Sequence, residues 1–423
     1  MQTSLRLLGR RNFAPLFATQ FLNAFNDNFY KMAMVVLVTY TIYSDPAKEQ
    51  AFNGLAAGLF ILPFFLFSAL AGQISDSTDK ARVARIIKSA EIAIMAVGAV
   101  AIWLQTIPLM LLVLFAMGVH SAFFGPLKYA ILPQHLEPEN VLGGTGLVEA
   151  GTYLAILSGT IAGGVIPAPV AAVAIVGFAI LGRLTAIGIP PAPPEADAPP
   201  LKLDWHIVRN SWRLVSATMH IPRLYLAIMA ISFFWAIGAV IIAIFPPLVK
   251  NALGADETVA TLFTAMFSVG IAIGSVAVNR LLKGKVSAKY GPVSVIVMGV
   301  FILDLWWAVS HWVPLSATLI DWRDFLAEPW GYRVVADLLG IAIAGGMFVV
   351  PLYAFLTTTV TKSQTARTIA ANNIVNSFMM VLGTLVYAGI GLLGVSITDA
   401  LLLVAAACLF SAWLAQTLHR ACD

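Results

Sequence analysis

Long apolar runs constrain the fold of this chain more than any other feature of its sequence. An α-helix of about 20 apolar residues spans the roughly 30 Å hydrocarbon core of a bilayer. Twelve runs of about this length predict an all-α integral membrane protein with twelve transmembrane helices. The runs are residues 13–42, 53–73, 86–105, 108–126, 144–166 and 168–187, then residues 224–249, 258–280, 290–312, 334–358, 369–391 and 398–417.

Composition agrees with a membrane location and argues against other classes. Of the 423 residues, 60% are hydrophobic and 11% are charged, whereas an average soluble protein is about 25% charged. The two cysteines, Cys408 and Cys422, are too few for a disulfide framework or a four-cysteine metal site. The net charge of +4 is explained by basic cytoplasmic loops. We therefore expect no metal, no cofactor and no nucleic-acid partner.

The placement of lysine and arginine predicts the orientation in the membrane. Cytoplasmic loops are enriched in these residues, and alternate loops of this chain hold most of the 25. Both termini are therefore predicted to be cytoplasmic. One of the basic loops contributes Lys80, Arg82, Arg85 and Lys88 to this count. The loops on the opposite side hold only Lys48, Lys250, Arg323 and Arg333.

The twelve runs form two sets of six, separated by the proline-rich segment IPPAPPEADAPP at residues 189–200. Prolines favour an extended linker. The next residues, 203–215, place apolar side chains on one helix face and Arg209 and Arg213 on the other. This pattern is typical of a helix on the membrane surface, although a helix packed on the bundle would show it too. The predicted domains are an N-terminal six-helix bundle (1–188), a linker with an interfacial helix (189–222) and a C-terminal six-helix bundle (223–423).

A weak internal repeat supports this division into halves. GPLKYAIL at residues 125–132 matches VPLYAFL at residues 350–356, and each ends the fourth span of its half. GLVEA at residues 146–150 then aligns with NIVNS at residues 373–377. Parallel repeats of this kind are typical of major facilitator transporters, whose substrate site lies between the halves near the midplane. The predicted architecture is therefore the major facilitator fold.

The segment GQISDSTDKARVAR, residues 72–85, resembles the signature loop of the major facilitator superfamily. Ser77 replaces the usual arginine of that loop, and Asp79 replaces a glycine. In the superfamily the loop locks the cytoplasmic side and rearranges as the carrier opens. The resemblance therefore implies a gating role, and the alternative is a charged turn that only sets orientation. The gating candidates are Gly72, Asp76, Lys80 and Arg82.

Six segments point to a narrower resemblance: QFLNAFNDN (20–28), GQISDSTDKARV (72–83), GPLKYAILP (125–133), TGLVEA (145–150), AGG (162–164) and GGMFVVPLYA (345–354). Together they resemble the bacterial lysophospholipid transporter family. The resemblance implies a multi-pass protein of the bacterial inner membrane. Such a protein moves lysophospholipids, chiefly lysophosphatidylethanolamine, from the outer to the inner leaflet for reacylation, by alternating access. It also implies a lysophospholipid acyltransferase/acyl-carrier-protein synthetase as a partner, since family members occur fused to such domains.

The first span carries the strongest candidates for the substrate site. A charge at the bilayer centre costs at least about 2.5–3.5 kcal/mol, so polar groups there usually mark a substrate or ion path. Asn23, Asp27 and Lys31 are spaced four residues apart and share one helix face. Together with Asn28 they are predicted to bind the phosphate and amine of a headgroup, because the seventh span lacks an arginine found in some family members. The alternative is an Asp27–Lys31 pair that only locks helices together.

Polar residues of other spans are weaker candidates. Glu149 is expected either to line the cavity or to pair with Lys128. Asn373 and Asn376 are expected either to contact the headgroup or to join helices.

Four more polar residues of the spans are expected either to be structural or to reach water. Asp304 is expected to have a structural partner, and His120 to be a satisfied core histidine. Glu91 and Asp337 are expected to reach water from the span ends.

An enzyme is excluded by missing motifs. A glycerolipid acyltransferase would need an aspartate five residues after a histidine, to hold that histidine as a base. None of the six histidines has one, and no glycine-rich loop ending in lysine is present to bind ATP. The remaining alternative is a carrier of a small polar solute or drug, because the fold does not settle the substrate.

Overall fold

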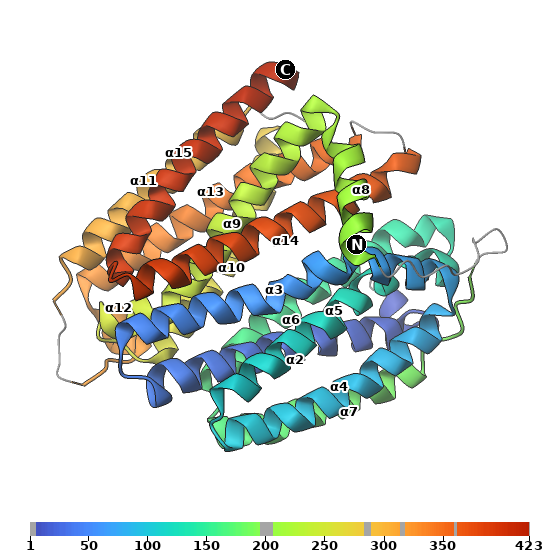
Figure 1. The fold of residues 1–423 in the computed structure, drawn as a ribbon, viewed down its shortest axis with the longest axis horizontal. Helices are drawn as coiled ribbons and strands as arrows, with labels where there is room; N and C mark the ends of the chain where they lie inside the picture. The colour runs from blue at the N-terminus through green and yellow to red at the C-terminus, as the bar shows by residue number, and fades with distance from the viewer. Residues whose placement is uncertain (1–5, 195–205, 283–288, 314–317, 359–361, 423) are drawn as a thin grey trace. The chain divides into compact units, whose positions relative to one another are not determined.

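The computed structural model describes residues 6–194, 206–282, 289–313, 318–358 and 362–422. These residues are helical apart from short connections and one isolated bridge between Ala255 and Ile320 (Figure 1). Short helical segments lie at η1 (Arg6–Gly9), the π-helical η2 (Leu37–Ile42), α8 (Ile207–Met219) and α12 (Trp322–Ala327).

Each predicted span corresponds to a long helix in the described ranges. Ten of these helices are apolar and long enough to cross a membrane. The other two, α2 and α6, are also long, and α2 carries the polar residues of the first span. The all-α prediction is confirmed. The helices are α2 (Ala14–Val36), α3 (Pro46–Ser77), α4 (Lys80–Trp103), α5 (Ile107–His135), α6 (Pro138–Val165), α7 (Ala168–Ile187), α9 (Pro222–Asn251), α10 (Glu257–Leu281), α11 (Gly291–Ser310), α13 (Pro329–Thr358), α14 (Lys362–Leu392) and α15 (Ile397–Cys422).

Several helices extend beyond the apolar runs that predicted them. Helix α3 begins at Pro46, whereas its apolar run begins at residue 53. The apolar run starts later because the first turns of the helix contain polar residues such as Glu49 and Gln50. Hydropathy locates only the part of a helix in hydrocarbon, whereas the hydrogen-bonded helix continues past it. Proline lies in the first turn of many of the long helices, where no intrahelical N–H bond is lost.

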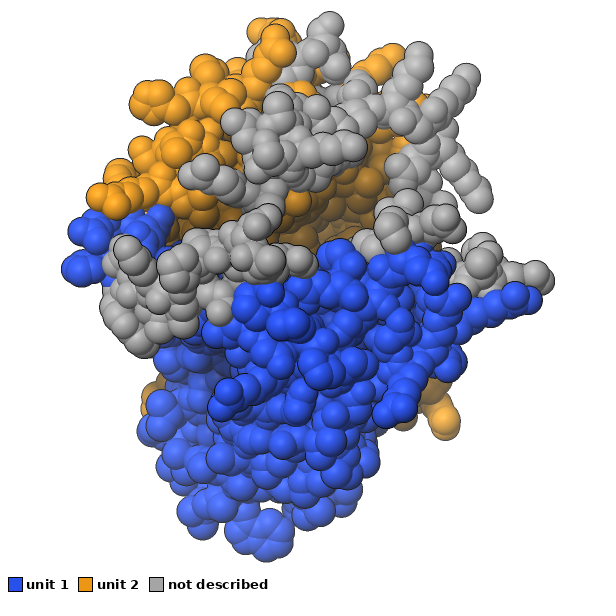
Figure 2. Space-filling model, turned by 90° about the vertical axis from the view of Figure 1, so that its right-hand side faces the viewer, with its two compact units in different colours: residues 1–37, 62–210 blue, residues 38–61, 211–423 orange. Residues whose placement is uncertain are grey.

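The chain divides into two compact units (Figure 2). Unit 1 comprises residues 1–37 and 62–210, and unit 2 comprises residues 38–61 and 211–423. In unit 1, α2 packs on α6 and α7, and α4 packs on α5 and α7. In unit 2, α13 packs on α10 and α11, while α9 packs on α14 and α15. Helix α3 contributes to both units, because its first part packs within unit 2 and its remainder within unit 1.

Glycines allow the closest of these helix approaches. A Cβ atom at Gly159 of α6 would collide with the backbone carbonyl of Phe25 in α2, and one at Gly163 with that of Phe29. In unit 2, a Cβ atom at Gly346 of α13 would collide in the same way with the carbonyl of Ile271 in α10. Small residues at helix crossings permit backbone contact in membrane proteins. The crossings of α2 with α6 and of α10 with α13 therefore depend on glycine.

The predicted amphipathic helix between the halves is present as α8. Val208 and Trp212 of its apolar face are 71% and 72% exposed, whereas Ser211 is buried. An apolar face turned outward is what a helix on a membrane surface requires. The exposure therefore favours the interfacial position over a helix packed through its apolar face.

Candidate functional site

Helix α2 brings several polar side chains into the interior of unit 1. Asn23, Asn26 and Asp27 are buried, whereas Asn28 and Lys31 are half-buried. The Asn28 amide donates to the carbonyl of Ala24 in its own helix at 2.8 Å. The candidates of the first span therefore divide into a buried group and a more accessible group.

The Asp27 carboxylate is held by helices α2 and α5. Its Oδ2 atom accepts a hydrogen bond from Asn23 Nδ2 at 3.1 Å and a second from the hydroxyl of Ser121 on α5. Asn23 Nδ2 also donates to Ser121 Oγ at 3.2 Å. The Oδ1 atom of Asp27 is buried and has no hydrogen-bond partner among the described residues. One oxygen of this carboxylate is therefore fixed and the other can accept a donor.

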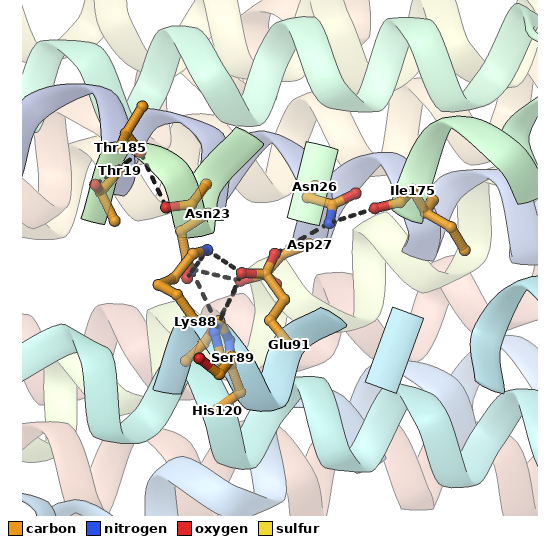
Figure 3. A network of polar contacts seen from close by, with 12 residues as sticks. Thr19, Asn23, Asn26, Asp27, Lys88, Ser89, Glu91, His120, Ile175 and Thr185 are labelled. Carbon is orange, nitrogen blue, oxygen red and sulfur yellow. Dashed lines mark hydrogen bonds and ion pairs between the residues drawn. The ribbon is translucent and has the colours of Figure 1, made fainter. Parts of the chain in front are cut away.

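Lys88 of α4 joins this group to a second carboxylate (Figure 3). Its ammonium forms an ion pair with Glu91 and donates to Asn23 Oδ1 at 3.2 Å. The Lys88 side chain is 0% exposed, so its assignment to a cytoplasmic loop was wrong. Helix α4 begins at Lys80, which places Lys88 more than two turns inside. A Cβ atom at Gly182 of α7 would lie only 2.8 Å from Lys88 Cε, so this glycine makes room for the lysine.

Glu91 lies at the centre of the network. Its Oε1 atom accepts from Asn26 Nδ2 at 3.0 Å, and its Oε2 atom is 3.5 Å from His120 Nε2 on α5. The Glu91 side chain is 1% exposed, so the expectation that it reaches water was wrong. His120 is buried, and its Nε2 atom faces the Glu91 carboxylate. Neither ring nitrogen has a hydrogen-bond partner among the described residues, so the prediction of a satisfied core histidine is not confirmed.

Helix α7 closes the network on its remaining side. Asn26 Nδ2 donates to the carbonyl of Ile175 at 3.1 Å. Nearby, the hydroxyls of Thr19 and Thr185 are 2.9 Å apart (Figure 3). Four helices of unit 1, α2, α4, α5 and α7, thus contribute to one buried polar cluster.

Sequence reasoning missed Lys88 and Ser121, and one local signal was available. Lys88 and Glu91 are spaced three residues apart, which places opposite charges on the same helix face. Such a pair inside an apolar run indicates burial of both charges together. Ser121 offered no comparable signal, because a serine in an apolar helix commonly bonds to its own backbone.

Lys31 lies one helical turn beyond Asp27 on α2 and is attracted electrostatically by it. The described hydrogen-bond partners of the Asp27 carboxylate are Asn23 and Ser121. The cation connected to this group through Asn23 is Lys88. Lys31, being half-buried, is the more accessible of the two lysines.

Two of the three other substrate-site candidates can be placed, both in unit 2. Asn376 of α14 is buried, accepts from Ser232 Oγ of α9 at 2.6 Å and donates to the Tyr353 hydroxyl of α13 at 3.2 Å. Trp235 Nε1 donates to the same hydroxyl at 3.0 Å. Asn373 is exposed. The side chain of Glu149 lies outside the described residues.

The gating candidates lie at the junction of α3 and α4. Asp79 caps α4 by accepting from the backbone N–H groups of Ala81 at 3.0 Å and Arg82 at 3.4 Å. It also accepts from Ala192 N at 3.1 Å, which ties the segment after α7 to this turn. An aspartate in place of the superfamily glycine therefore has a local role as a helix cap. Of the four candidates, Gly72 is half-buried, Lys80 is buried, Arg82 is exposed, and the Asp76 side chain lies outside the described residues.

Asp304 has the structural partner that the sequence analysis expected. Arg333 of α13 donates to it from Nε at 3.1 Å and from a terminal nitrogen at 2.5 Å. The guanidinium also lies over the Trp307 ring, 4.5 Å from its centroid. Asp337 was expected to reach water, but it is buried at 3% exposure one turn along α13, so that prediction was wrong.

The chain is similar in sequence to known membrane transporters. The Major Facilitator Superfamily profile matches residues 16–384. The chain is 30% identical over 366 residues to the lysophospholipid transporter LplT of Serratia proteamaculans, covering 84% of this chain and 82% of the relative. It is 26% identical over 398 residues to LplT of Escherichia coli (strain K12 / DH10B), covering 92% and 91%.

Solved structures with the same fold include transporters of other solutes. A mutant of the nucleoside transporter NupG superposes with a TM-score of 0.70 at 12% identity, covering 96% of this chain and 99% of that one. A POT family peptide transporter gives a TM-score of 0.68 at 11% identity and covers 97% of each chain. These likenesses confirm the predicted fold.

Proposed function

Because the chain belongs to the major facilitator superfamily and, within it, to the lysophospholipid transporter family, we propose that it carries lysophospholipids such as lysophosphatidylethanolamine across the bacterial inner membrane. It works by alternating access, from the outer to the inner leaflet, and is a carrier rather than an enzyme. The multi-pass membrane location follows from the family and from ten long apolar helices.

The buried Asp27 carboxylate is the observation that carries this proposal. A lysophosphatidylethanolamine headgroup has an anionic phosphate beside a cationic amine. Asp27 offers the amine its Oδ1 atom, which the described residues leave without a hydrogen bond. Lys31, half-buried and one turn away, offers the phosphate an ammonium. Charge-assisted hydrogen bonds of this kind are about twice as strong as neutral ones.

Lys88, Glu91 and Ser121 support this pair without contacting the lipid. Asn23 connects them, since its Oδ1 accepts from Lys88 while its Nδ2 donates to Asp27. Both oxygens of the Glu91 carboxylate face buried partners, so the position of α2 relative to α4 and α5 is fixed. Asn28 adds neutral hydrogen-bonding capacity on α2. Glu149 and, in unit 2, Asn373 and Asn376 are also proposed to bind substrate, each within its own unit.

The product of this transport is a lysophospholipid in the inner leaflet. It lacks one acyl chain, so the reaction that consumes it is an acyl transfer at the cytoplasmic surface. The proposed partner is therefore a lysophospholipid acyltransferase/acyl-carrier-protein synthetase, with both termini of the carrier on the cytoplasmic side.

Cysteines replacing Lys48 or Arg323 should react with an impermeant reagent from outside, because both positions are predicted to be extracytoplasmic. Reaction only from the cytoplasm would contradict this orientation.

Uptake by reconstituted protein tests the proposed substrate. Proteoliposomes should accumulate labelled lysophosphatidylethanolamine, but not a nucleoside or a dipeptide, at rates well above those of protein-free vesicles. Other carriers with the same fold transport these solutes, so they test whether uptake is specific for the lysolipid rather than a general property of the fold. Saturable uptake of one of these solutes, with no lysolipid movement, would favour the alternative of a polar-solute carrier.

A further inference from the structure

The ammonium of Lys250, at the end of α9, is fully coordinated by groups from the first half of the sequence. Its Nζ atom donates to the carbonyls of Thr39 at 2.5 Å and Tyr43 at 2.9 Å, and to Glu49 Oε1 at 2.6 Å. A lysine ammonium has three protons. All three therefore have acceptors, and two of these are backbone groups at and just beyond η2.

Each carboxylate oxygen of Glu49, the partner of Lys250, also accepts a hydrogen bond. The Glu49 side chain is 0% exposed. Its Oε2 atom accepts from Asn251 Nδ2 at 2.5 Å, while Oε1 accepts from Lys250. Consecutive residues of α9 thus hold both oxygens. A buried ion pair is favourable only when its geometry is good and its remaining hydrogen-bonding groups are satisfied, and this pair meets both conditions.

The residues that follow Glu49 pack α3 tightly against α14. Gln50 Nε2 donates to the carbonyl of Tyr387 at 3.1 Å. A Cβ atom at Gly54 would lie 2.6 Å from the carbonyl oxygen of Thr384, and one at Gly58 would lie 2.9 Å from the Thr384 hydroxyl. Thr384 is consequently covered by α3 and is 0% exposed.

We propose that the Glu49–Lys250 pair is the latch that closes the extracytoplasmic side of the carrier. The inference rests on the proposed transport function, because alternating access requires one side to open while the other is closed. Lys250 lies in the last turn of α9, at the end predicted to be extracytoplasmic, and the pair joins a helix of the first sequence half to one of the second. Helix α3 belongs to unit 2 only up to residue 61. When the latch breaks, we expect these first turns of α3 to separate from α9 and α14.

A second ion pair of unit 2 provides a matched control. Asp304 and Arg333 also bring together a carboxylate and a cation from different helices, but both helices belong to the second half of the sequence. Their side chains are 39% and 40% exposed. Breaking this pair removes a charge interaction without releasing α3.

Thiol labelling of Thr384→Cys tests the latch, in a background with Cys408→Ala and Cys422→Ala. The protein is placed in nanodiscs and exposed to a maleimide, and the labelling rate reports how often α3 leaves α14. Glu49→Gln should raise this rate at least tenfold, which corresponds to about 1.4 kcal/mol. Lys250→Met should raise it further, because it leaves Glu49 Oε1 and two carbonyls without the ammonium that donates to them. Asp304→Asn should leave the rate within twofold of the parent.

The double variant Glu49→Gln with Lys250→Met tests whether the two residues act through one interaction or through independent effects. Its labelling rate should be no higher than that of Lys250→Met, because a broken pair has no interaction left to lose. Rates within twofold of the parent for Glu49→Gln, in protein that stays monodisperse, would overturn the latch. Labelling does not depend on the substrate, so a changed rate without lysolipid uptake would support the latch and contradict the proposed substrate.

Discussion

Asp27→Asn combined with Lys31→Gln should reduce the uptake of lysophosphatidylethanolamine by about a hundredfold or more. Each charge is proposed to make one charge-assisted hydrogen bond to the headgroup, worth about 1.5–3 kcal/mol. Losing both corresponds to at least two orders of magnitude in binding. The double replacement keeps shape and removes both charges together. Initial rates of uptake into proteoliposomes are the measurement.

Single replacements on α2 are less informative than the double one. A buried charge without its partner destabilises a protein by about 3–5 kcal/mol, so loss of folding would be confused with loss of binding. Asp304→Asn serves as the control, because it removes one carboxylate far from α2 in the sequence. If the double variant is monodisperse and transports at the parent rate, Asp27 and Lys31 do not bind the substrate.

Lys88→Met should strongly lower the thermal stability of the protein in detergent. It leaves the Glu91 carboxylate, which is 1% exposed, without its ammonium partner. The expected destabilisation is about 3–5 kcal/mol, which is large against a typical total stability of about 5–15 kcal/mol. The measurement is the melting temperature of the purified protein, followed by size-exclusion chromatography after heating.

Adding Glu91→Gln to Lys88→Met should restore most of the lost stability. The double variant has no unpaired charge at this position, and a glutamine still offers an oxygen to Asn26. Replacing a whole buried pair is often close to neutral. The control Asp304→Asn breaks a half-exposed pair and should change the stability by less than about 1 kcal/mol. A melting temperature that is unchanged in Lys88→Met would contradict the role assigned to this pair.

Local properties of the sequence were sufficient to predict the helices. An apolar run such as residues 224–249 must be helical in a membrane, because every backbone N–H and C=O there needs an internal partner. The surface helix could be predicted for the same kind of reason, since Arg209 and Arg213 share a face opposite Val208 and Trp212. Motif resemblance also indicated the family, because the residues of each motif are contiguous in the sequence.

The burial of individual charged side chains could not be predicted from local properties of the sequence. Lys88 and Glu91 were both assigned to positions near water, and Asp337 likewise, yet all three are buried. Near the end of an apolar run, hydropathy does not say which face of the helix turns inward. That depends on the neighbouring helices, and here Gly182 of α7 and Asn26 of α2 provide the space and the hydrogen bonds.

The sequence by itself determined that this protein is a twelve-helix membrane carrier of the lysophospholipid transporter family, and that polar groups lie in its first span. Only the tertiary structure decided which of these groups pair. Asp27 meets Ser121, Asn23 meets Lys88, and Glu49 meets Lys250 across about 200 residues of sequence. The physical reason is that a charge in an apolar interior must find its partner in space. Sequence spacing reveals such a partner only when both groups lie on one helix.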